Sequence, residues 1–358
     1  MSSSPITIRL GQRARQRIAA DGVQAADIAI VPAAAGGPKG LILHGLDCWM
    51  FGEFFRHAPR QRRLVGASIG AWRMAASAFQ DPVAAHRRLA RLYAGQRYPN
   101  KVTPDYVSRT CRALLDELLD GRGAEAIQHP QYQLSILTVR GIGALGSTNG
   151  ARWREMTGFL LAAAGNALSR KRLAASMERV VFHHHHDDAS WLRDGFDAFA
   201  NHFVALSDAN LRDALLASGS IPLVLEAVTD IAGAPAGAYW DGGLIDYHLH
   251  LPYQRDPGLV LYPHFSDYIV PGWLDKSMPW RRARDQALDN MILVSPSPEF
   301  VASLPNAKLP DRKDFKVYGQ DHERRNRDWL QAIGESQRMA DAFARWCEQP
   351  DLKQTVSF

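Results

Sequence analysis

The chain lacks the features that mark secreted, metal-bound and membrane-spanning proteins. Its three cysteines, Cys48, Cys111 and Cys347, are too few and too widely spaced for a disulfide framework or a zinc site. The longest apolar stretch, around residues 159–164, is much shorter than a membrane span. The first residues do not show the basic segment and apolar run of a secretory leader. We therefore expect a cytoplasmic protein.

Internal repeats, low-complexity tracts and a proline- or serine-rich linker are also missing from the sequence. Its 358 residues, 46% of them hydrophobic and 22% charged, are ordinary for a globular protein with a sizeable core. We therefore expect one domain over residues 1–358, which ends in a helical extension at about 305–358.

Short apolar runs alternate with helical patterns along the chain. Such alternation is typical of an α/β layer fold, in which helices cover a mainly parallel sheet. The expected strands lie at 26–31, 63–67, 134–139, 180–182, 238–240, 260–262 and 291–294. The expected helices lie at 38–56, 71–79, 82–93, 103–120, 151–176, 211–218 and 321–347.

Positive charge is in excess, with a net charge of +5 and arginine clusters near 56–63, 87–91 and 281–284. Such clusters are usually the solvated faces of helices and the edges of loops. The alternative is attraction to an anionic membrane surface or to an acidic substrate. Nucleic acid is not expected as a partner, because no nucleic-acid-binding module is present and aromatic residues do not alternate regularly with the arginines.

Ser68 lies in Gly66-Ala67-Ser68-Ile69-Gly70, a G-x-S-x-G motif between a strand-like run and a helical stretch. In this motif a sharp turn from strand to helix exposes the serine, and small neighbours keep the turn free of clashes. The start of the helix also favours developing negative charge through its amides and its dipole. Ser68 is therefore a candidate nucleophile.

A glycine-rich loop at 34–40 follows the first expected strand and begins a helix. Gly36 and Gly37 would present backbone amides at a helix N-terminus, as an oxyanion hole requires. A phosphate-binding loop is a rival interpretation, but G-x-G-x-x-G is absent and Lys39 is not followed by Ser or Thr. A plain turn from strand to helix is the other alternative.

Asp241 is the candidate partner of Ser68. It ends a strand-like run and precedes two glycines, so its carboxylate is expected on a tight turn at the edge of the sheet where α/β proteins carry their chemistry. Taken alone, such an Asp-Gly-Gly sequence is most often a simple turn. The small-residue corner at 218–222 likewise indicates only a turn.

Together and in this order, the four segments resemble the patatin-like acyl hydrolase family over residues 27–245. The matching positions are Gly36, Gly37, Lys39 and Gly40 of the oxyanion loop, the Ser68 motif, the 218–222 block and the Asp241 turn. The resemblance implies a three-layer α/β/α fold with a mainly parallel central sheet. It also implies a serine acyl hydrolase of lipid or other carboxylic esters, with a Ser68–Asp241 dyad and no histidine, metal or organic cofactor. The oxyanion hole would comprise the amides of Gly36, Gly37 and Ile69.

The oxyanion loop departs from the family pattern at three positions. Ala34 and Ala35 replace the usual Asp and Gly, and Pro38 has no amide hydrogen to donate. The asparagine that often follows the Asp-Gly-Gly of this family is missing, and Asp246 lies in that region. A lipid- or acyl-binding protein that has lost turnover is therefore a second hypothesis, from a different functional class.

Histidines supply an alternative chemistry. His248, His250 and His264 follow Asp241, so the Ser-Asp-His order of a hydrolase triad is formally available, although the run 247–251 alternates like an ordinary packed strand. The four histidines at 183–186 do not have the spacing of a metal site, because consecutive side chains of an extended chain point to opposite faces. We expect a strand end there and no metal.

Three further side chains are expected near the substrate. Lys39 would hold an anionic head group or face solvent, and these two roles stay open. Trp72, four residues after Ser68, and Trp240, beside Asp241, are expected in the wall of the pocket. Asp241 itself is expected to be partly screened from water, because only a carboxylate with a raised pKa can take the proton of a serine.

Overall fold

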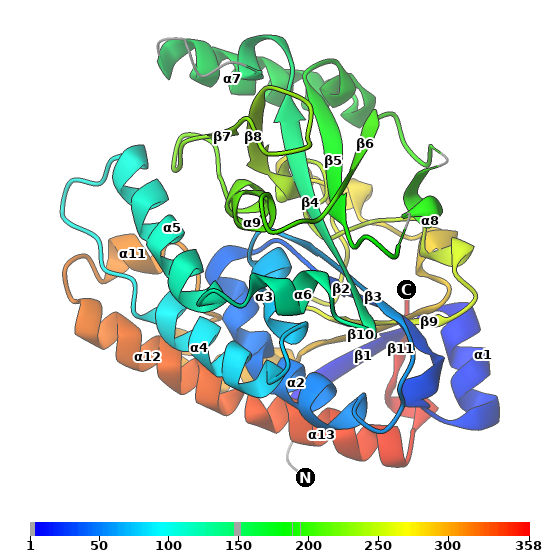
Figure 1. Ribbon diagram of the computed structural model, residues 1–358. Helices are drawn as coiled ribbons and strands as arrows, with labels where there is room; N and C mark the ends of the chain where they lie inside the picture. The colour runs from blue at the N-terminus through cyan, green and yellow to red at the C-terminus, as the bar shows by residue number, and fades with distance from the viewer. Residues whose placement is uncertain (1–3, 147–151, 188, 194) are drawn as a thin grey trace.

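The computed structural model describes residues 4–146, 152–187, 189–193 and 195–358. One mixed sheet of eleven strands runs through the described part of the chain (Figure 1). The strands are β1 (Ile6–Leu10), β2 (Ile28–Ala33), β3 (Arg62–Ala67), β4 (Tyr132–Gly141), β5 (Met177–His183), β6 (Asn201–Ala205), β7 (Val228–Thr229), β8 (Ala238–Asp241), β9 (Leu259–Pro263), β10 (Met291–Pro296) and β11 (Val356–Ser357). Their order along the sheet is β11-β1-β10-β9-β2-β3-β4-β5-β6, and β8 pairs with both β4 and β7.

The centre of the sheet is parallel, from β10 through β9, β2 and β3 to β4. Every residue of β2, β9 and β10 is buried, as expected for strands covered on both faces. All seven strands expected from the sequence are present, with bounds that differ by at most three residues. Four strands were not expected: β1, β6, β7 and β11. They are short or partly exposed strands at the rim of the sheet, where apolar runs are not required.

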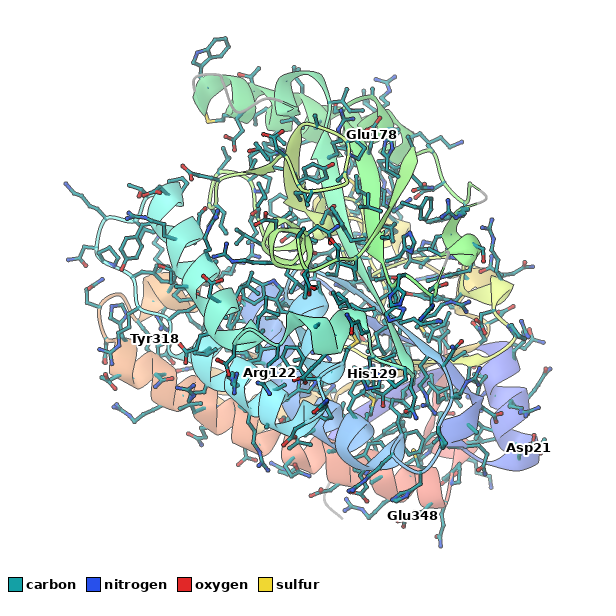
Figure 2. All side chains as sticks on the ribbon, in the orientation of Figure 1. Asp21, Arg122, His129, Glu178, Tyr318 and Glu348 are labelled. Carbon is teal, nitrogen blue, oxygen red and sulfur yellow. The ribbon has the colours of Figure 1, made fainter. Side chains whose placement is uncertain are left out.

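Helices flank the sheet on both sides, which gives a three-layer α/β/α fold (Figure 1). They are α1 (Gln12–Asp21), α2 (His44–Trp49), α3 (Ile69–Ser77), α4 (Pro82–Ala94), α5 (Pro104–Leu119), α6 (Gly123–Ile127), α7 (Arg152–Leu168), α8 (Ser190–Arg193), α9 (Leu211–Ser218), α10 (Pro298–Ser303), α11 (Asp314–Val317), α12 (His322–Glu335) and α13 (Gln337–Glu348). Figure 2 shows Asp21 and Glu348, at the ends of α1 and α13, on the outer surface.

Three long helices expected from the sequence are divided in the structure. The expected helix at 151–176 is α7 followed by a separate 3₁₀ segment (Arg170–Ala175), and residue 151 lies outside the described residues. The region 38–56 is a 3₁₀ segment (Gly37–Leu43), then α2, then a wider π-helical turn (Met50–Phe54), because its glycines and proline are poor formers of a regular α-helix. The region 321–347 is split between α12 and α13 at Ser336. The Ser336 hydroxyl donates to the Ile333 carbonyl and accepts the Gly45 amide, so it ties this break to α2.

The C-terminal segment packs onto the same core as the rest of the chain. α12 contacts α4, α13 contacts α2, and β11 pairs in parallel with β1 at the edge of the sheet. One cluster of buried residues contains side chains from Ile6 to Trp346. The C-terminal segment therefore shares a hydrophobic core with the N-terminal strands.

β4 is the strand that positions the candidate site. Its first residues pair in parallel with β3, and the last of these pairs joins Ala67 to Leu137. Its later residues pair antiparallel with β8, starting where Thr138 lies opposite Asp241. Because β5 occupies the other edge of β4, β3 and β8 lie end to end along one edge, and their final residues meet there. This register brings Ser68 next to Asp241 across 173 positions of sequence.

Candidate active site

Ser68 occupies the turn between β3 and α3 with a strained backbone. Its φ of 55° and ψ of −131° are uncommon for a residue with a side chain, and such strain typically costs about 1–3 kcal/mol. Its glycine neighbours make the turn feasible. A Cβ at Gly70 would lie 1.9 Å from the Ala33 carbonyl oxygen, and one at Gly66 would lie 2.5 Å from the Ala71 nitrogen.

The hydroxyl of Ser68 faces the carboxylate of Asp241. Ser68 Oγ donates to Asp241 Oδ2 at 2.7 Å, and the amide of Gly243 donates to Oδ1 at 2.7 Å. Both side chains are buried. Burial raises the pKa of Asp241, while the charge of Arg312 and the two hydrogen bonds act in the opposite direction. A carboxylate with raised proton affinity is suited to take a proton from a serine.

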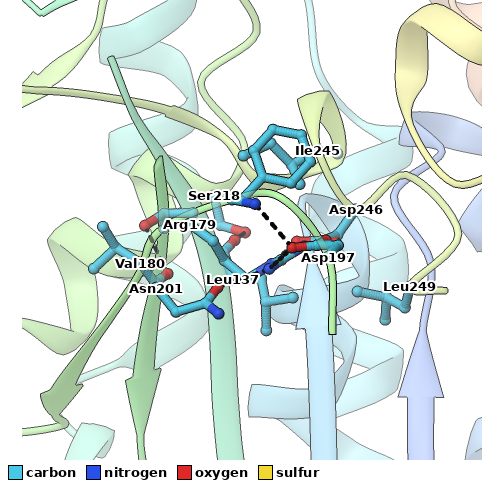
Figure 3. A network of polar contacts seen from close by, with 12 residues as sticks. Leu137, Arg179, Val180, Asp197, Asn201, Ser218, Ile245, Asp246 and Leu249 are labelled. Atoms are coloured by element: carbon cyan, nitrogen blue, oxygen red, sulfur yellow. Dashed lines mark hydrogen bonds and ion pairs between the residues drawn. The ribbon is translucent and has the colours of Figure 1, made fainter. Parts of the chain in front are cut away.

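The turn after Asp241 lies directly against β4. A Cβ at Gly242 would lie 2.1 Å from the Leu137 carbonyl oxygen, so only glycine fits this crossing. Asp246, three residues beyond Gly243, is buried and accepts two hydrogen bonds from Arg179 of β5. Arg179 also donates to Asp197, as Figure 3 shows. This network, buried at Arg179 and Asp246, anchors the Asp241 turn, and sequence reasoning missed it because its members are far apart in the chain.

A second support, missed by the sequence analysis, comes from the corner at 218–222. The buried Ser218 hydroxyl accepts the Ser68 amide at 2.8 Å and donates to the Leu137 carbonyl at 2.7 Å. The Ser220 carbonyl accepts the Asp241 amide at 2.9 Å. Both members of the candidate pair are therefore fixed by this corner. The only sequence signal was its small residues just after a helix.

The glycine-rich loop lies beside the candidate pair. Gly36 lines a cavity together with Ser68 and Asp241, and it packs so closely on Phe265 that a Cβ would lie 2.4 Å from the ring. Ile69 is the first residue of α3, where an α-helix leaves its amides without intrahelical partners. Gly37 has a φ of 57° and borders the side chain of Arg312, and it does not line the cavity wall.

The departures in this loop have structural roles. Ala34 and Ala35 are buried, and the Ala35 amide donates to the Tyr247 carbonyl at 2.9 Å. That amide is therefore already committed within the fold. Pro38 lies at the start of the 3₁₀ segment, where a proline is well tolerated because its missing amide hydrogen has no helical partner to lose.

Two cavities meet at Ser68, and we name them A and B. Cavity A, of about 540 Å³, lies between α3, α5 and the C-terminal segment. Cavity B, of about 550 Å³, lies between α7, the glycine-rich loop and the Asp241 turn. Ser68, Ile221 and Arg312 line both. Asp241 lines cavity B but not cavity A.

The three expected pocket residues have different positions. Trp72 lines cavity A, with its Nε1 donating to the Leu215 carbonyl, and Lys39 lines cavity B. Trp240 lines neither cavity, so the structure corrects that expectation. Successive residues of a strand point to opposite faces, and Trp240 accordingly packs against Phe159 while its Nε1 donates to the Leu145 carbonyl.

Histidines have no hydrogen bond to Ser68 in the described part of the chain, where the partner of its hydroxyl is Asp241. The run 247–251 is not the strand that its alternation suggested, because Leu249 takes a φ of 46° and the chain turns there. His248 and His264 are packed ring against ring, and burial lowers both their pKa values, that of His264 to about 3. His250 pairs with Asp285.

The run of histidines at 183–186 begins at the end of β5. His183 bonds through Nδ1 to backbone oxygens, and the rings of the next three histidines pack against one another. Burial, with the charges of its neighbours, lowers the pKa of His184 to about 4. Among the described residues, no group of three or more His, Cys, Asp or Glu side chains is placed to hold a metal ion.

A comparison with protein families identifies the family of the chain. A family model described as patatin-like phospholipase matches residues 35–248, more than half of the chain. The chain therefore belongs to the patatin-like phospholipase family, whose activity is the hydrolysis of acyl esters of lipids. Comparison with curated proteins finds no match. In the described ranges, no helix is both long and apolar enough to cross a membrane.

Proposed function

We propose that this protein is a serine acyl hydrolase that cleaves carboxylic esters of lipids through a Ser68–Asp241 dyad. The observation that carries the proposal is the direct 2.7 Å hydrogen bond between the Ser68 hydroxyl and a buried carboxylate. The strained turn of Ser68 and its position at the start of α3 also support the proposal, because both features are typical of an activated serine nucleophile.

In the proposed reaction, ionised Asp241 takes the Ser68 proton while Oγ attacks the ester carbonyl. The oxyanion would be stabilised by the amides of Gly36, Gly37 and Ile69. Asp241 then protonates the departing alcohol oxygen, which leaves an acyl group on Ser68. Finally Asp241 activates a water molecule, which releases the carboxylic acid and restores the serine.

Peripheral contact with a lipid surface is part of the proposal. Several large apolar side chains of α7 are exposed: Met156, Leu160, Leu161 and Leu168. Met156 and Leu160 also line cavity B, so the exposed apolar surface continues into the site. A lipid could thus reach Ser68 from a membrane surface along this apolar wall.

A lipid-binding protein without turnover is the second candidate. It is favoured by one observation: the Ala35 amide is already bonded and Pro38 has none, so few donors remain for the oxyanion. In other serine hydrolases, removal of one oxyanion donor costs about 3–4 kcal/mol of transition-state stabilisation.

Labelling with a fluorophosphonate probe tests the proposal. We expect the native protein to label at Ser68 and to hydrolyse p-nitrophenyl esters. Ser68→Ala should abolish both, and Asp241→Asn should lower hydrolysis by about 10⁴-fold or more, the loss typical of removing a triad or dyad member. Circular dichroism checks that both variants fold. Full activity in Asp241→Asn would refute the dyad, and absence of labelling and hydrolysis in the native protein would favour the binding protein.

A further inference from the structure

Cavity B is lined by four cationic side chains, Lys39, Lys276, Arg312 and Lys313, and by the carboxylate of Asp311 in addition to that of Asp241. Three of these cations, Lys39, Lys276 and Arg312, interact electrostatically with one another. The guanidinium Nε of Arg312 lies 3.0 Å from the place that a Gly37 Cβ would occupy, directly beside the oxyanion loop. Arg312 and Lys276 are also the two cations whose charges act on Asp241. The positive charge is therefore concentrated at the reacting atoms.

These cations have no carboxylate partner at ion-pair distance within the described ranges of the chain. Aromatic rings hold the two lysines instead: Lys276 Nζ lies 4.1 Å from the centre of the Tyr247 ring, and Lys39 Nζ lies 5.5 Å from that of Phe265. Burial, together with the charges of Arg312 and Lys39, lowers the pKa of Lys276 to about 7. An anion bound among the three would relieve this repulsion.

The position of Asp241 indicates which part of an ester enters each cavity. The departing alcohol oxygen must receive its proton from Asp241, and Asp241 lines cavity B alone. The alcohol part of the substrate therefore belongs in cavity B, among the cations. The acyl chain is left with cavity A, whose wall combines apolar side chains such as Trp72, Val107 and Leu225 with the cationic Lys316 and Arg325.

We propose that Arg312, assisted by Lys276, determines specificity by binding a phosphate group on the alcohol part of the substrate in cavity B, while the acyl chain occupies cavity A. This inference rests on the proposed function and deepens it. Arg312 follows the end of the family match at residue 248, as do Phe315 and Lys316 in the wall of cavity A. The C-terminal segment thus supplies the selectivity of a site whose reacting groups lie within the family region.

A pair of substrates that differ only in charge tests the role of Arg312. We compare a 1-acylglycerol with the 1-acylglycerol 3-phosphate of the same chain. Arg312→Gln should lower the ratio of kcat/KM for the phosphate substrate over that for the neutral substrate by about 10–100-fold, the effect of losing a charge-assisted hydrogen bond. Lys276→Gln should act in the same direction. The matched control is Arg327→Gln, an exposed arginine of α12 outside both cavities, which should leave both substrates unchanged.

An equal loss on both substrates would overturn the proposal, because Arg312 would then serve the oxyanion or the fold. A native enzyme that does not prefer the phosphate substrate would overturn it as well. Circular dichroism and thermal melting confirm that each variant is folded before its kinetics are compared.

Binding without turnover separates this inference from the proposed function. In the Ser68→Ala background, calorimetry measures the binding of dodecyl phosphate, dodecanol and inorganic phosphate. Adding Arg312→Gln should weaken the binding of dodecyl phosphate by about tenfold or more and leave the binding of dodecanol unchanged. Unchanged binding of dodecyl phosphate overturns the inference, and so does inorganic phosphate that binds as tightly as dodecyl phosphate. If binding depends on Arg312 but the native protein hydrolyses no ester, the phosphate site stands and the hydrolase proposal fails.

Filling each cavity tests where the acyl chain lies. Cys111→Trp on α5 narrows cavity A, and Ala163→Trp on α7 narrows cavity B. We expect Cys111→Trp to lower the ratio of kcat/KM for long-chain over short-chain p-nitrophenyl esters by about tenfold, since each excluded methylene removes binding energy. Ala163→Trp should leave that ratio unchanged. The reverse pattern would place the acyl chain in cavity B.

Discussion

Ser218→Ala removes the hydroxyl that holds the backbone of the candidate nucleophile. That hydroxyl is buried, accepts the Ser68 amide and donates to the Leu137 carbonyl. In the variant the Ser68 amide and the Leu137 carbonyl stay buried, and each of them lacks one hydrogen bond. A buried polar group that loses its partner typically costs about 1–3 kcal/mol. For two such groups we expect a loss of about 2–5 kcal/mol in the free energy of unfolding.

The same substitution should lower activity, although Ser218 does not touch the reacting atoms. The positive φ of Ser68 stores about 1–3 kcal/mol of backbone strain, which the hydrogen bond from its amide helps to maintain. Once that bond is lost, the turn can relax and move the hydroxyl away from Asp241. A displacement of about 1 Å at a reacting atom costs about 100-fold in rate, so we expect kcat to fall by that order.

Urea unfolding and ester kinetics measure the two effects, and Ser135→Ala is the matched control. Ser135 lies on β4, two residues before Leu137, and is equally buried, but its hydroxyl has no hydrogen-bond partner among the described residues. Its replacement should be neutral or slightly stabilising, within about 1 kcal/mol, with kcat unchanged. The reasoning is refuted if Ser218→Ala loses no more stability than Ser135→Ala, or if it keeps native kcat.

Three further predictions concern the surroundings of the site. Asp241→Asn should raise stability by about 0.5–2 kcal/mol at neutral pH. Burial raises the pKa of Asp241, so the native protein loses stability as the pH rises from 3.8 through the raised pKa of the folded state. The variant and the native protein should therefore have nearly equal melting temperatures below pH 3.8. Above pH 3.8 the variant should melt at a higher temperature, by a difference that grows as the pH rises. Gly70→Ala should destabilise by about 3 kcal/mol or more through overlap with a backbone carbonyl, whereas Gly334→Ala, in open space on α12, should stabilise by about 0.5–1 kcal/mol in the same urea assay. Asp246→Asn should destabilise by about 3–5 kcal/mol, because it leaves the buried Arg179 with one fewer carboxylate; native-like stability would contradict this.

The buried part of the fold could be predicted because the residues that it requires are consecutive in the sequence. A strand covered on both faces is mainly apolar along its length, and β2, β9 and β10 show this in consecutive residues. β1 and β11 escaped prediction because they pair at the edge of the sheet with segments almost the whole chain away. The five residues of β1 contain no signal that specifies such a distant partner.

At the candidate site, the expected contact between Ser68 and Asp241 is present, but its supports were not foreseeable. The G-x-S-x-G and Asp-Gly-Gly motifs are local, since each records how its own backbone must turn. Ser218 and Arg312 act through space on residues more than a hundred positions away. Trp240 was misplaced for a simpler reason: adjacency in sequence was taken as adjacency in space, although neighbours on a strand face opposite ways.

The end-to-end placement of β3 and β8 along β4 also has a consequence for folding. A shift of β8 by one residue would turn the Asp241 side chain to the other face of the sheet and separate it from Ser68. β8 pairs with a strand about a hundred positions earlier, and such distant pairings form slowly. Recovery of esterase activity during refolding would therefore report on the register of β8. Molecules with native helix content and no activity would be those in which β8 had paired in the wrong register.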